Sequence, residues 1–148
     1  MKKWIVLGIL IILCGCTAQG GFTLTDITFC DGEPGDRSYI ENPDATYTQG
    51  ETVWMYLEGL SFLTEEKGNK FVGSFDVELE LFDDQGNSLG EFSQLLEEPS
   101  DEEPDYVWFK FWVDSSTLVA GTYTVRITIT DRLSGETVSV EGTFKVVR

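Results

Sequence analysis

The sequence contains no histidine, and this absence removes much of the usual chemistry of enzymes. Histidine supplies the common general base near pH 7, the base partner of catalytic serine and cysteine, and the most frequent zinc ligand. A phosphate-binding loop, a dinucleotide-binding glycine pattern and a metal-spaced cysteine cluster are also missing from the sequence. We therefore expect a protein that is not an enzyme and that holds no cofactor and no metal ion.

Positive charge is scarce as well. Ten Lys and Arg residues stand against 26 Asp and Glu residues, which gives a formal net charge of −16. Nucleic acids bind positive surfaces, so the charge argues against a nucleic-acid partner. A pair of carboxylates for glycoside hydrolysis could be drawn from any of the 26 acids, and their presence therefore assigns no catalytic pair.

The sequence has a single long apolar run, and it lies close to residue 1. Lys2 and Lys3 precede an unbroken apolar stretch from Trp4 to Leu13. A run of about ten residues has the length of a signal-peptide core and is too short to span a bilayer as a helix. This pattern predicts export from the cytoplasm.

The residues that follow this run, Leu13-Cys14-Gly15-Cys16, resemble the lipobox of prokaryotic lipoproteins. The resemblance implies cleavage before Cys16, a diacylglyceryl group on its thiol, and a membrane anchor made of two lipid chains. The expected location is the cell envelope, lipid-anchored and facing outside the cytoplasm. An ordinary secretory signal and an uncleaved N-terminal anchor are the alternatives. We divide the chain into a signal peptide (1–15), a lipidated tether (16–21) and a folded domain (22–148).

The folded domain alternates apolar and polar residues with the period of a β-strand. Seven strands are expected, and no helix is evident beyond a short helical turn that Thr64 to Lys67 would allow. The four prolines fall between the expected strands, as the missing proline N–H requires. The expected strands are Phe22 to Cys30, Thr52 to Glu58, Phe75 to Phe82, Leu89 to Leu95, Tyr106 to Val113, Thr122 to Thr130 and Glu136 to Val147.

Two long connections and one acidic loop separate these strands. Asp31 to Gly50 is rich in Gly, Pro, Asp and Asn, and Gly59 to Gly73 carries several apolar residues that should pack somewhere. Glu97 to Asp105 contains mostly acids and is expected to be a solvated loop. Asp83 to Asn87 and Arg132 to Gly135 have the composition of hairpin turns.

The segment Leu118-Val119-Ala120-Gly121-Thr122-Tyr123 resembles the tyrosine corner of immunoglobulin-like sandwiches, with Tyr123 and Gly121 as its structural residues. From Gly121 onward, the chain is similar to the last hairpin of exported prokaryotic immunoglobulin-like modules, including PKD-type domains. The resemblance implies an all-β, two-sheet sandwich of about seven antiparallel strands. The cysteine pair of antibody domains is absent, so antibody-type recognition is not implied.

The alternation predicts which side chains face outward on each sheet. The third, sixth and seventh expected strands should form one sheet with a polar outer face. In the second and fifth strands, most outward positions are aromatic, and the charged residues Glu58, Lys110 and Asp114 mark the outward side. Immunoglobulin-like topology pairs these two strands, so four aromatic residues should share one surface: Trp54, Tyr56, Trp108 and Trp112.

Two interpretations of this aromatic surface stay open. A contiguous exposed patch of four large aromatic side chains would mark a binding site, since soluble monomers seldom expose one. Alternatively, Asp31 to Gly50 or Gly59 to Gly73 folds across the surface as a lid and makes it a second small core. We favour the lid, because both connections flank the second strand.

Two further features invite a chemical interpretation. The oxygen-rich turn Asp83 to Asn87 and the acidic loop Glu97 to Asp105 offer calcium ligands, but their spacing matches no calcium-binding loop. Cys30 has no partner within the folded domain, and we expect it to be a small buried hydrophobic side chain at the end of a strand.

The sequence thus predicts a membrane-anchored, extracytoplasmic lipoprotein whose β-sandwich binds or scaffolds rather than catalyses. The partner would be a glycan or a protein held on the aromatic surface. The alternative is a structural or proteinase-inhibitor-like module that acts through its loops. The sequence specifies neither the ligand nor the oligomeric state.

Overall fold

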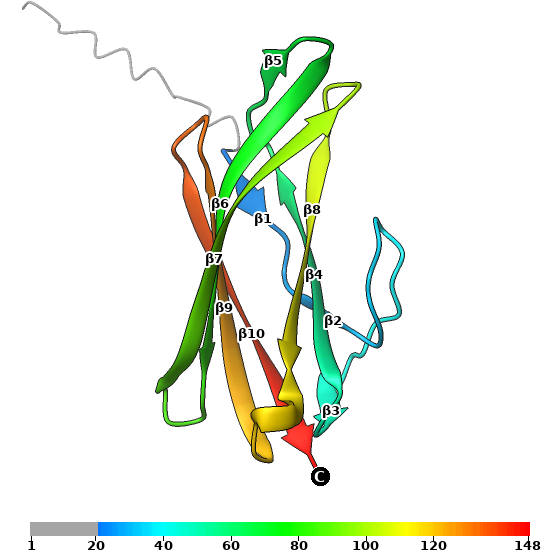
Figure 1. The fold of residues 1–148 in the computed structure, drawn as a ribbon, viewed down its shortest axis with the longest axis vertical. Helices are drawn as coiled ribbons and strands as arrows, with labels where there is room; N and C mark the ends of the chain where they lie inside the picture. Colours follow the sequence, from blue (N-terminus) through cyan, green and yellow to red (C-terminus); the bar gives the residue numbers. More distant parts are fainter. Residues whose placement is uncertain (1–20) are drawn as a thin grey trace, which may run out of the picture.

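The computed structural model describes residues 21–148, which form a β-sandwich (Figure 1). The predicted signal peptide and the lipidation residue Cys16 lie outside the described residues. The elements are β1 (Thr23–Leu24), β2 (Thr28–Cys30), β3 (Thr46–Thr48), β4 (Thr52–Leu60), β5 (Glu65–Lys67), β6 (Lys70–Phe82), β7 (Ser88–Ser100), β8 (Tyr106–Asp114), the 3-10 helix η1 (Ser115–Thr117), β9 (Gly121–Asp131) and β10 (Thr137–Val147).

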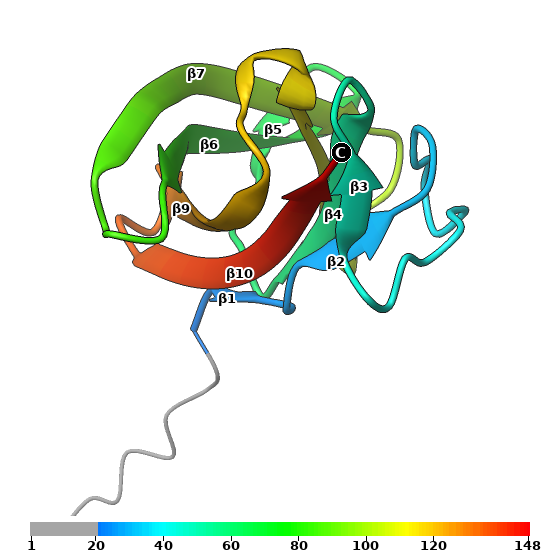
Figure 2. The ribbon, with the colours of Figure 1, turned by 90° about the horizontal axis from the view of Figure 1, so that it is seen from below.

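The strands form two sheets that face each other, as Figure 2 shows along the strand direction. In the smaller sheet, β4 pairs with β8 on one side and with β1 and β2 on the other. In the larger sheet, the order is β3-β10-β9-β6, and both β5 and β7 pair with β6. All pairings are antiparallel within residues 21–148 except that of β3 with β10.

This topology confirms the expected immunoglobulin-like sandwich. The third, sixth and seventh expected strands are β6, β9 and β10 and share one sheet, while the second and fifth are β4 and β8 and pair in the other. The Tyr123 hydroxyl donates to the Val119 carbonyl oxygen at 2.5 Å, which is the contact of a tyrosine corner. Gly121 opens β9, but a Cβ there would meet no atom within 4 Å, so packing does not require glycine.

The core lies between the two sheets and consists of the inward positions of the long strands. Val53, Met55 and Leu57 of β4 and Val125, Ile127 and Ile129 of β9 belong to one hydrophobic cluster, and all six are fully buried. Each such side chain contributes about 1.5–3 kcal/mol relative to an exposed one. An aromatic cluster closes one end: Phe75 packs against Phe22, Phe62 and Phe109 with ring centroids 6.0, 5.3 and 5.4 Å away.

The outer face of β6, β9 and β10 is polar, as the alternation predicts. Arg126 of β9 pairs with Glu141 of β10 at 2.9 Å and with Glu80 of β6 at 3.8 Å. Thr128 and Ser139 share a hydrogen bond of 2.8 Å beside them. Cross-strand polar pairs of this kind stabilise the sheet and leave its outer face polar.

Two expected boundaries near the start of the domain differ from the structure. Phe22 to Cys30 is not one strand but two short ones, β1 and β2, which pair with opposite ends of β4. The connection Asp31 to Gly50 contains an additional strand, β3, which pairs in parallel with β10. Tyr47 explains β3, because its buried hydroxyl donates to the Cys30 carbonyl oxygen at 2.9 Å.

The connection Gly59 to Gly73 is largely extended rather than a loop. β4 continues to Leu60 and β6 begins at Lys70, and the predicted helical turn at Thr64 to Lys67 is wrong because Glu65–Lys67 form β5. A two-residue turn joins β5 to β6, and Gly68 takes a φ of 61° there. Hairpin pairing with β6 therefore outcompetes the weak local preference for a helix.

The predicted acidic loop Glu97 to Asp105 is a loop only in its second part. β7 runs to Ser100, so Pro99 lies within a strand and not between strands. β7 pairs only with β6 among the described residues, and an edge strand tolerates proline because one side of its backbone needs no partner. Within residues 21–148, no helix is long and apolar enough to cross a membrane.

Candidate functional site

The four predicted aromatic residues share the outer face of the smaller sheet. Trp54 of β4 lies opposite Trp112 of β8, with ring centroids 5.9 Å apart. Tyr56 lies opposite Lys110, and its ring stacks diagonally on Trp108 at 6.0 Å. Strand pairing thus brings together residues that are more than fifty positions apart in the sequence.

These four side chains differ in how much of them solvent reaches. Trp112 is 60% exposed, whereas Tyr56 is only 3% exposed. Trp54 and Trp108 are half-buried. The outer face therefore contains one exposed ring, Trp112, two half-buried rings, Trp54 and Trp108, and one covered ring, Tyr56.

The cover comes from the chain between β2 and β3, which lies on the side of the smaller sheet that faces away from the larger one (Figure 1). It is an ordered excursion, since the Asp31 N–H donates to the Ile40 carbonyl oxygen and Gly35 and Ser38 exchange backbone hydrogen bonds. The Arg37 N–H donates to the Tyr56 hydroxyl at 3.2 Å, and the ring of Tyr39 lies 4.6 Å from that of Tyr56. The Asp31 to Gly50 segment is thus a partial lid.

Three side-chain contacts hold this lid on the sheet. The Arg37 guanidinium donates to both carboxylate oxygens of Glu58, at 2.9 and 3.0 Å. The Tyr106 hydroxyl donates to Asp36 at 2.7 Å, and the Lys110 ammonium donates to Glu33 at 2.5 Å. The Gly59 to Gly73 segment, the other candidate for a lid, completes β4 and then enters the larger sheet as β5 and the start of β6, and its Phe62 packs on the core residue Phe75.

The cluster that joins the lid to the sheet, formed by Arg37, Glu58 and Tyr56, is electrostatically matched. Hydrogen bonding from the Arg37 guanidinium holds the pKa of the Glu58 carboxyl below its usual value. Burial, and then hydrogen bonding to Glu58, raises the pKa of Tyr56, whose hydroxyl donates to that carboxylate at 2.7 Å. Because Glu58 is ionised and Tyr56 neutral at pH 7, the cluster satisfies its own charges and offers no free acid or base.

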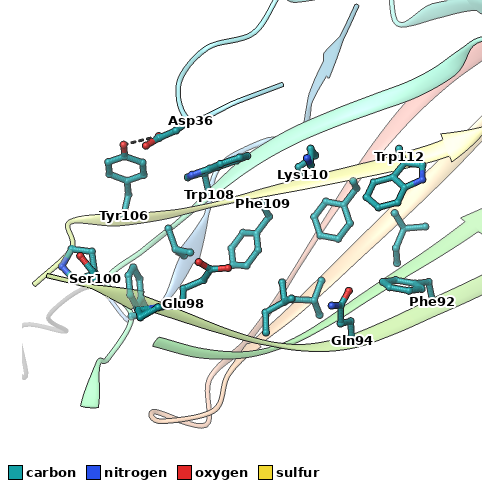
Figure 3. A pocket seen from close by; sticks show the side chains of 18 residues that line it. Asp36, Phe92, Gln94, Glu98, Ser100, Tyr106, Trp108, Phe109, Lys110 and Trp112 are labelled. Carbon is teal, nitrogen blue, oxygen red and sulfur yellow. Dashed lines mark hydrogen bonds between the residues drawn. The ribbon is translucent and has the colours of Figure 1, made fainter. Parts of the chain in front are cut away.

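Beside the aromatic face, a groove of about 710 Å³ separates β7 from β8 (Figure 3). Val77 and Leu79 of β6, together with Phe109 and Phe111 of β8, supply apolar walls. β7 contributes Phe92, Gln94, Leu96 and Glu98 from the other side, and the exposed rings of Phe92 and Trp112 stand at one end of the groove. The groove continues around the edge of β8 to the outer face through Trp108 and Lys110.

The prediction from sequence did not include this groove. We expected this strand to end at Leu95. Phe92 lies opposite Leu79 of β6, which faces inward, so its place in the pattern is that of an ordinary core residue. In the structure Phe92 is 54% exposed, because β8 does not approach β7 closely enough to cover it. One signal was available: Gln94 and Glu98 share the inward side of β7, and buried cores seldom hold such residues.

The two remaining candidates are accounted for by local structure. The Asp83 carboxylate accepts hydrogen bonds from the Gln85 and Asn87 N–H groups, so it stabilises its own turn, and these bonds lower its pKa. No cluster of three or more potential metal ligands occurs among residues 21–148. Cys30 ends β2 fully buried as expected, and burial raises the pKa of its thiol to about 11.

Comparisons with known proteins add little to this description. No family model matches the chain, and no curated protein sequence does. Among solved structures, the chain is similar to part of the β-glucuronidase of Bacteroides uniformis, with 11% identity and a TM-score of 0.41. The similarity covers 81% of this chain and 12% of that one, so the chain spans a small fraction of that enzyme.

Proposed function

We propose that this protein is a lipid-anchored, extracytoplasmic binding module that has no catalytic activity. Its ligand surface is the aromatic face of β4 and β8, and its ligand is a glycan or a protein. The observation that supports this proposal most directly is Trp112, which is 60% exposed with the Trp54 ring 5.9 Å away. Exposed, rigid aromatic pairs are typical of recognition surfaces.

The lid adjusts the extent of this surface. Four aromatic residues were expected to bind, but Tyr56 is covered by Arg37 and Tyr39 and serves to hold the lid. The binding surface is therefore Trp54, Trp108 and Trp112. A preformed surface loses little entropy on binding, since its side chains are already fixed by their neighbours.

The covered cluster argues against hydrolysis by paired carboxylates. Glu58 is the one acid at the centre of the aromatic face, and its two oxygens accept from Arg37 and Tyr56. A general acid needs a raised pKa, whereas that of Glu58 is lowered. A binding role fits this environment better than catalysis.

The alternative, an inhibitory module that acts through its loops, has weaker support. Loops that insert into a proteinase must project from the domain, but the Asp31 to Gly50 segment is tied to its own sheet by Glu33, Asp36 and Arg37. Deleting Glu33 to Ile40 tests this alternative. If the deletion abolishes partner binding while substitutions of Trp54 and Trp112 leave it unchanged, the loops rather than the aromatic face bind the partner.

The anchor is tested by a Cys16→Ser substitution in the native cell. Wild-type protein should fractionate with membranes and carry a covalent diacylglyceryl group detectable by mass spectrometry. The substituted chain should lose both properties. A wild-type protein with an unmodified Cys16 would contradict the lipoprotein proposal and leave the binding proposal to its own test.

The binding surface is tested with an array of glycans and with membrane-protein extracts from the same cell. A ligand that binds there should lose about tenfold or more affinity on Trp112→Ala or Trp54→Ala, as hot-spot aromatics do. Val119→Ala is the matched control, because Val119 is 70% exposed but lies outside the aromatic face. Equal effects of all three substitutions would reject the aromatic face as the ligand surface.

A further inference from the structure

The groove between β7 and β8 lies where the sandwich lacks a strand. In an immunoglobulin constant-type fold, the strand after the third core strand pairs in the sheet of the second and fifth. Here that strand is β7, and it pairs instead with β6 in the larger sheet. The far edge of β8 therefore has no neighbour among the described residues, and neither does the far edge of β7.

An unpaired strand edge is a binding surface in its own right. β8 is nine residues long and presents its free N–H and C=O groups toward the groove. Natural proteins protect such edges with charges, prolines or bulges. β7 has these protections, with Pro99, an irregularity near Gly90 and several acids, whereas β8 carries Lys110 within an aromatic run and Asp114 at its end.

The groove beside this edge has the chemistry that an added strand needs. A strand paired with β8 would direct every second side chain inward, against Val77, Leu79 and the ring of Phe111. The opposite wall adds Phe92 and Leu96, so small or medium apolar side chains fit at the inward positions. The intervening side chains of the added strand would face solvent on the outer side.

The acidic residues near the groove favour positively charged side chains at the outward positions of an added strand. The stretch from Ser88 to Asp105 contains seven acids and no Lys or Arg. Lys67 and Lys70 pair with only two of them, Glu97 and Asp101. The seven acids are Glu91, Glu97, Glu98, Asp101, Glu102, Glu103 and Asp105. An added strand with cationic side chains would relieve this repulsion, and an acidic one would increase it.

A second copy of this chain is a poor occupant. Each copy carries a formal net charge of −16, so two copies that pair through β8 repel each other. Two β7 strands that overlap fully about a two-fold axis would place Glu91 opposite Glu97, and like charges in that position destabilise a strand pair.

We infer that the groove binds an extended, cationic segment of another protein, which adds as a strand to the free edge of β8. The segment alternates apolar residues, which enter the groove, with Lys or Arg residues, which face solvent on the outer side and are attracted by the net charge of −16. Main-chain hydrogen bonds to β8 provide affinity, and the apolar side chains that enter the groove fix the register of the added strand. Trp108 and Trp112 of the proposed aromatic ligand surface also line the groove, whereas Trp54 belongs to that surface alone and serves to distinguish the two sites.

The test uses four capped octapeptides and the purified protein. The first alternates lysine with valine, and the second carries glutamate in place of lysine. The third and fourth are the lysine peptide with N-methyl groups on alternate residues, one isomer for each edge, so that both orientations are covered. Binding is measured by fluorescence polarisation, and protection of the Tyr106–Asp114 amides is measured by hydrogen exchange.

The inference predicts that the lysine peptide binds and that the β8 amides gain protection. At least one N-methylated isomer should bind about tenfold or more weakly, since it lacks the edge N–H donors but keeps charge and side chains. The glutamate peptide should not bind. Equal binding of the lysine peptide and both isomers, or binding without protection of β8, would mean adsorption to the acidic surface and would overturn the inference.

Substitutions locate the site and separate it from the proposed function. Phe92→Ala should weaken binding of the lysine peptide, and Leu95→Ala should not, because Leu95 lies opposite Asp76 on the outer face of the same strand. Trp54→Ala should weaken a ligand of the aromatic face and leave the peptide unaffected. If the lysine peptide does not bind but another ligand still binds through Trp54, the inference about the groove is rejected and the proposed aromatic ligand surface is not. Concentration-dependent dimers that protect β8 without peptide would also overturn the inference, in favour of a second copy.

Discussion

The Arg37 guanidinium donates to both oxygens of the Glu58 carboxylate, at 2.9 and 3.0 Å, and lies over the ring of Tyr106 at 3.6 Å from its centroid. One side chain in the lid thus contacts both β4 and β8 of the smaller sheet. The planar guanidinium makes this possible, because its edge pairs with a carboxylate while its face stacks on an aromatic ring. A lysine at this position could not do both.

Arg37→Ala should therefore loosen the lid without unfolding the domain. Trp108 lies between Tyr106 and Lys110, the two residues of β8 that hold the lid, so it should become more accessible. In a W54F/W112F background, where Trp108 is the sole tryptophan of the folded domain, we expect a red shift of its emission and stronger quenching by acrylamide. Arg132→Ala is the control, because Arg132 pairs with Asp76 on the other sheet. Unchanged quenching in Arg37→Ala would show that the lid does not depend on this pair.

The same pair makes the lid sensitive to acid. The folded-state pKa of Glu58 lies below its ordinary value of 4.5, so the ionised pair stabilises the closed lid fully above about pH 4.5 and loses this contribution as the pH falls through the folded-state pKa. Emission of Trp108 in the background above should stay constant from pH 7 to about 5 and shift at lower pH. Glu58→Gln should remove this transition while far-UV circular dichroism confirms the fold. A transition that persists in Glu58→Gln would assign it to another acid.

Strand alternation predicted the faces of the sandwich, and the structure confirms them. Asp76 and Glu78 mark the outer side of β6 while Val77 and Leu79 mark the inner side, and a half-buried sheet requires this separation wherever the register is fixed. The pairing of β4 with β8 followed from the resemblance at Tyr123, since that resemblance supplied a topology that periodicity alone does not.

The lid and the groove could not be located in the same way. The contact between Arg37 and Glu58 joins two charged residues that are 21 positions apart, and each alone is typical of a solvated surface. The groove exists because β7 stays with β6 rather than crossing to β8, a choice that leaves Phe92 exposed although its local pattern is that of a core residue. Both features depend on tertiary placement, which local patterns do not encode.

Tyr123→Phe tests the tyrosine corner that carried this topology. The substitution removes the hydrogen bond to the Val119 carbonyl oxygen and keeps the buried ring, which stacks on Phe144 at 5.6 Å. We expect a loss of about 1 kcal/mol in the free energy of unfolding, measured by urea denaturation with an unchanged m-value. Tyr39→Phe is the control, since Tyr39 is 42% exposed and makes no hydrogen bond through its hydroxyl within the described residues. A cost below that of the control would mean that the corner contributes only packing.

Phe75 and Phe92 test the distinction between the closed core and the open groove. Both occupy inward positions of neighbouring strands, yet Phe75 is fully buried among three other phenylalanine rings and Phe92 is 54% exposed. Phe75→Ala should lower the free energy of unfolding by about 3–5 kcal/mol, because it leaves a cavity in the aromatic cluster. Phe92→Ala should change it by about 0.5 kcal/mol or less, as surface substitutions do. If both substitutions cost several kcal/mol in urea denaturation, Phe92 would be packed against β8 in solution and the groove between β7 and β8 would be closed.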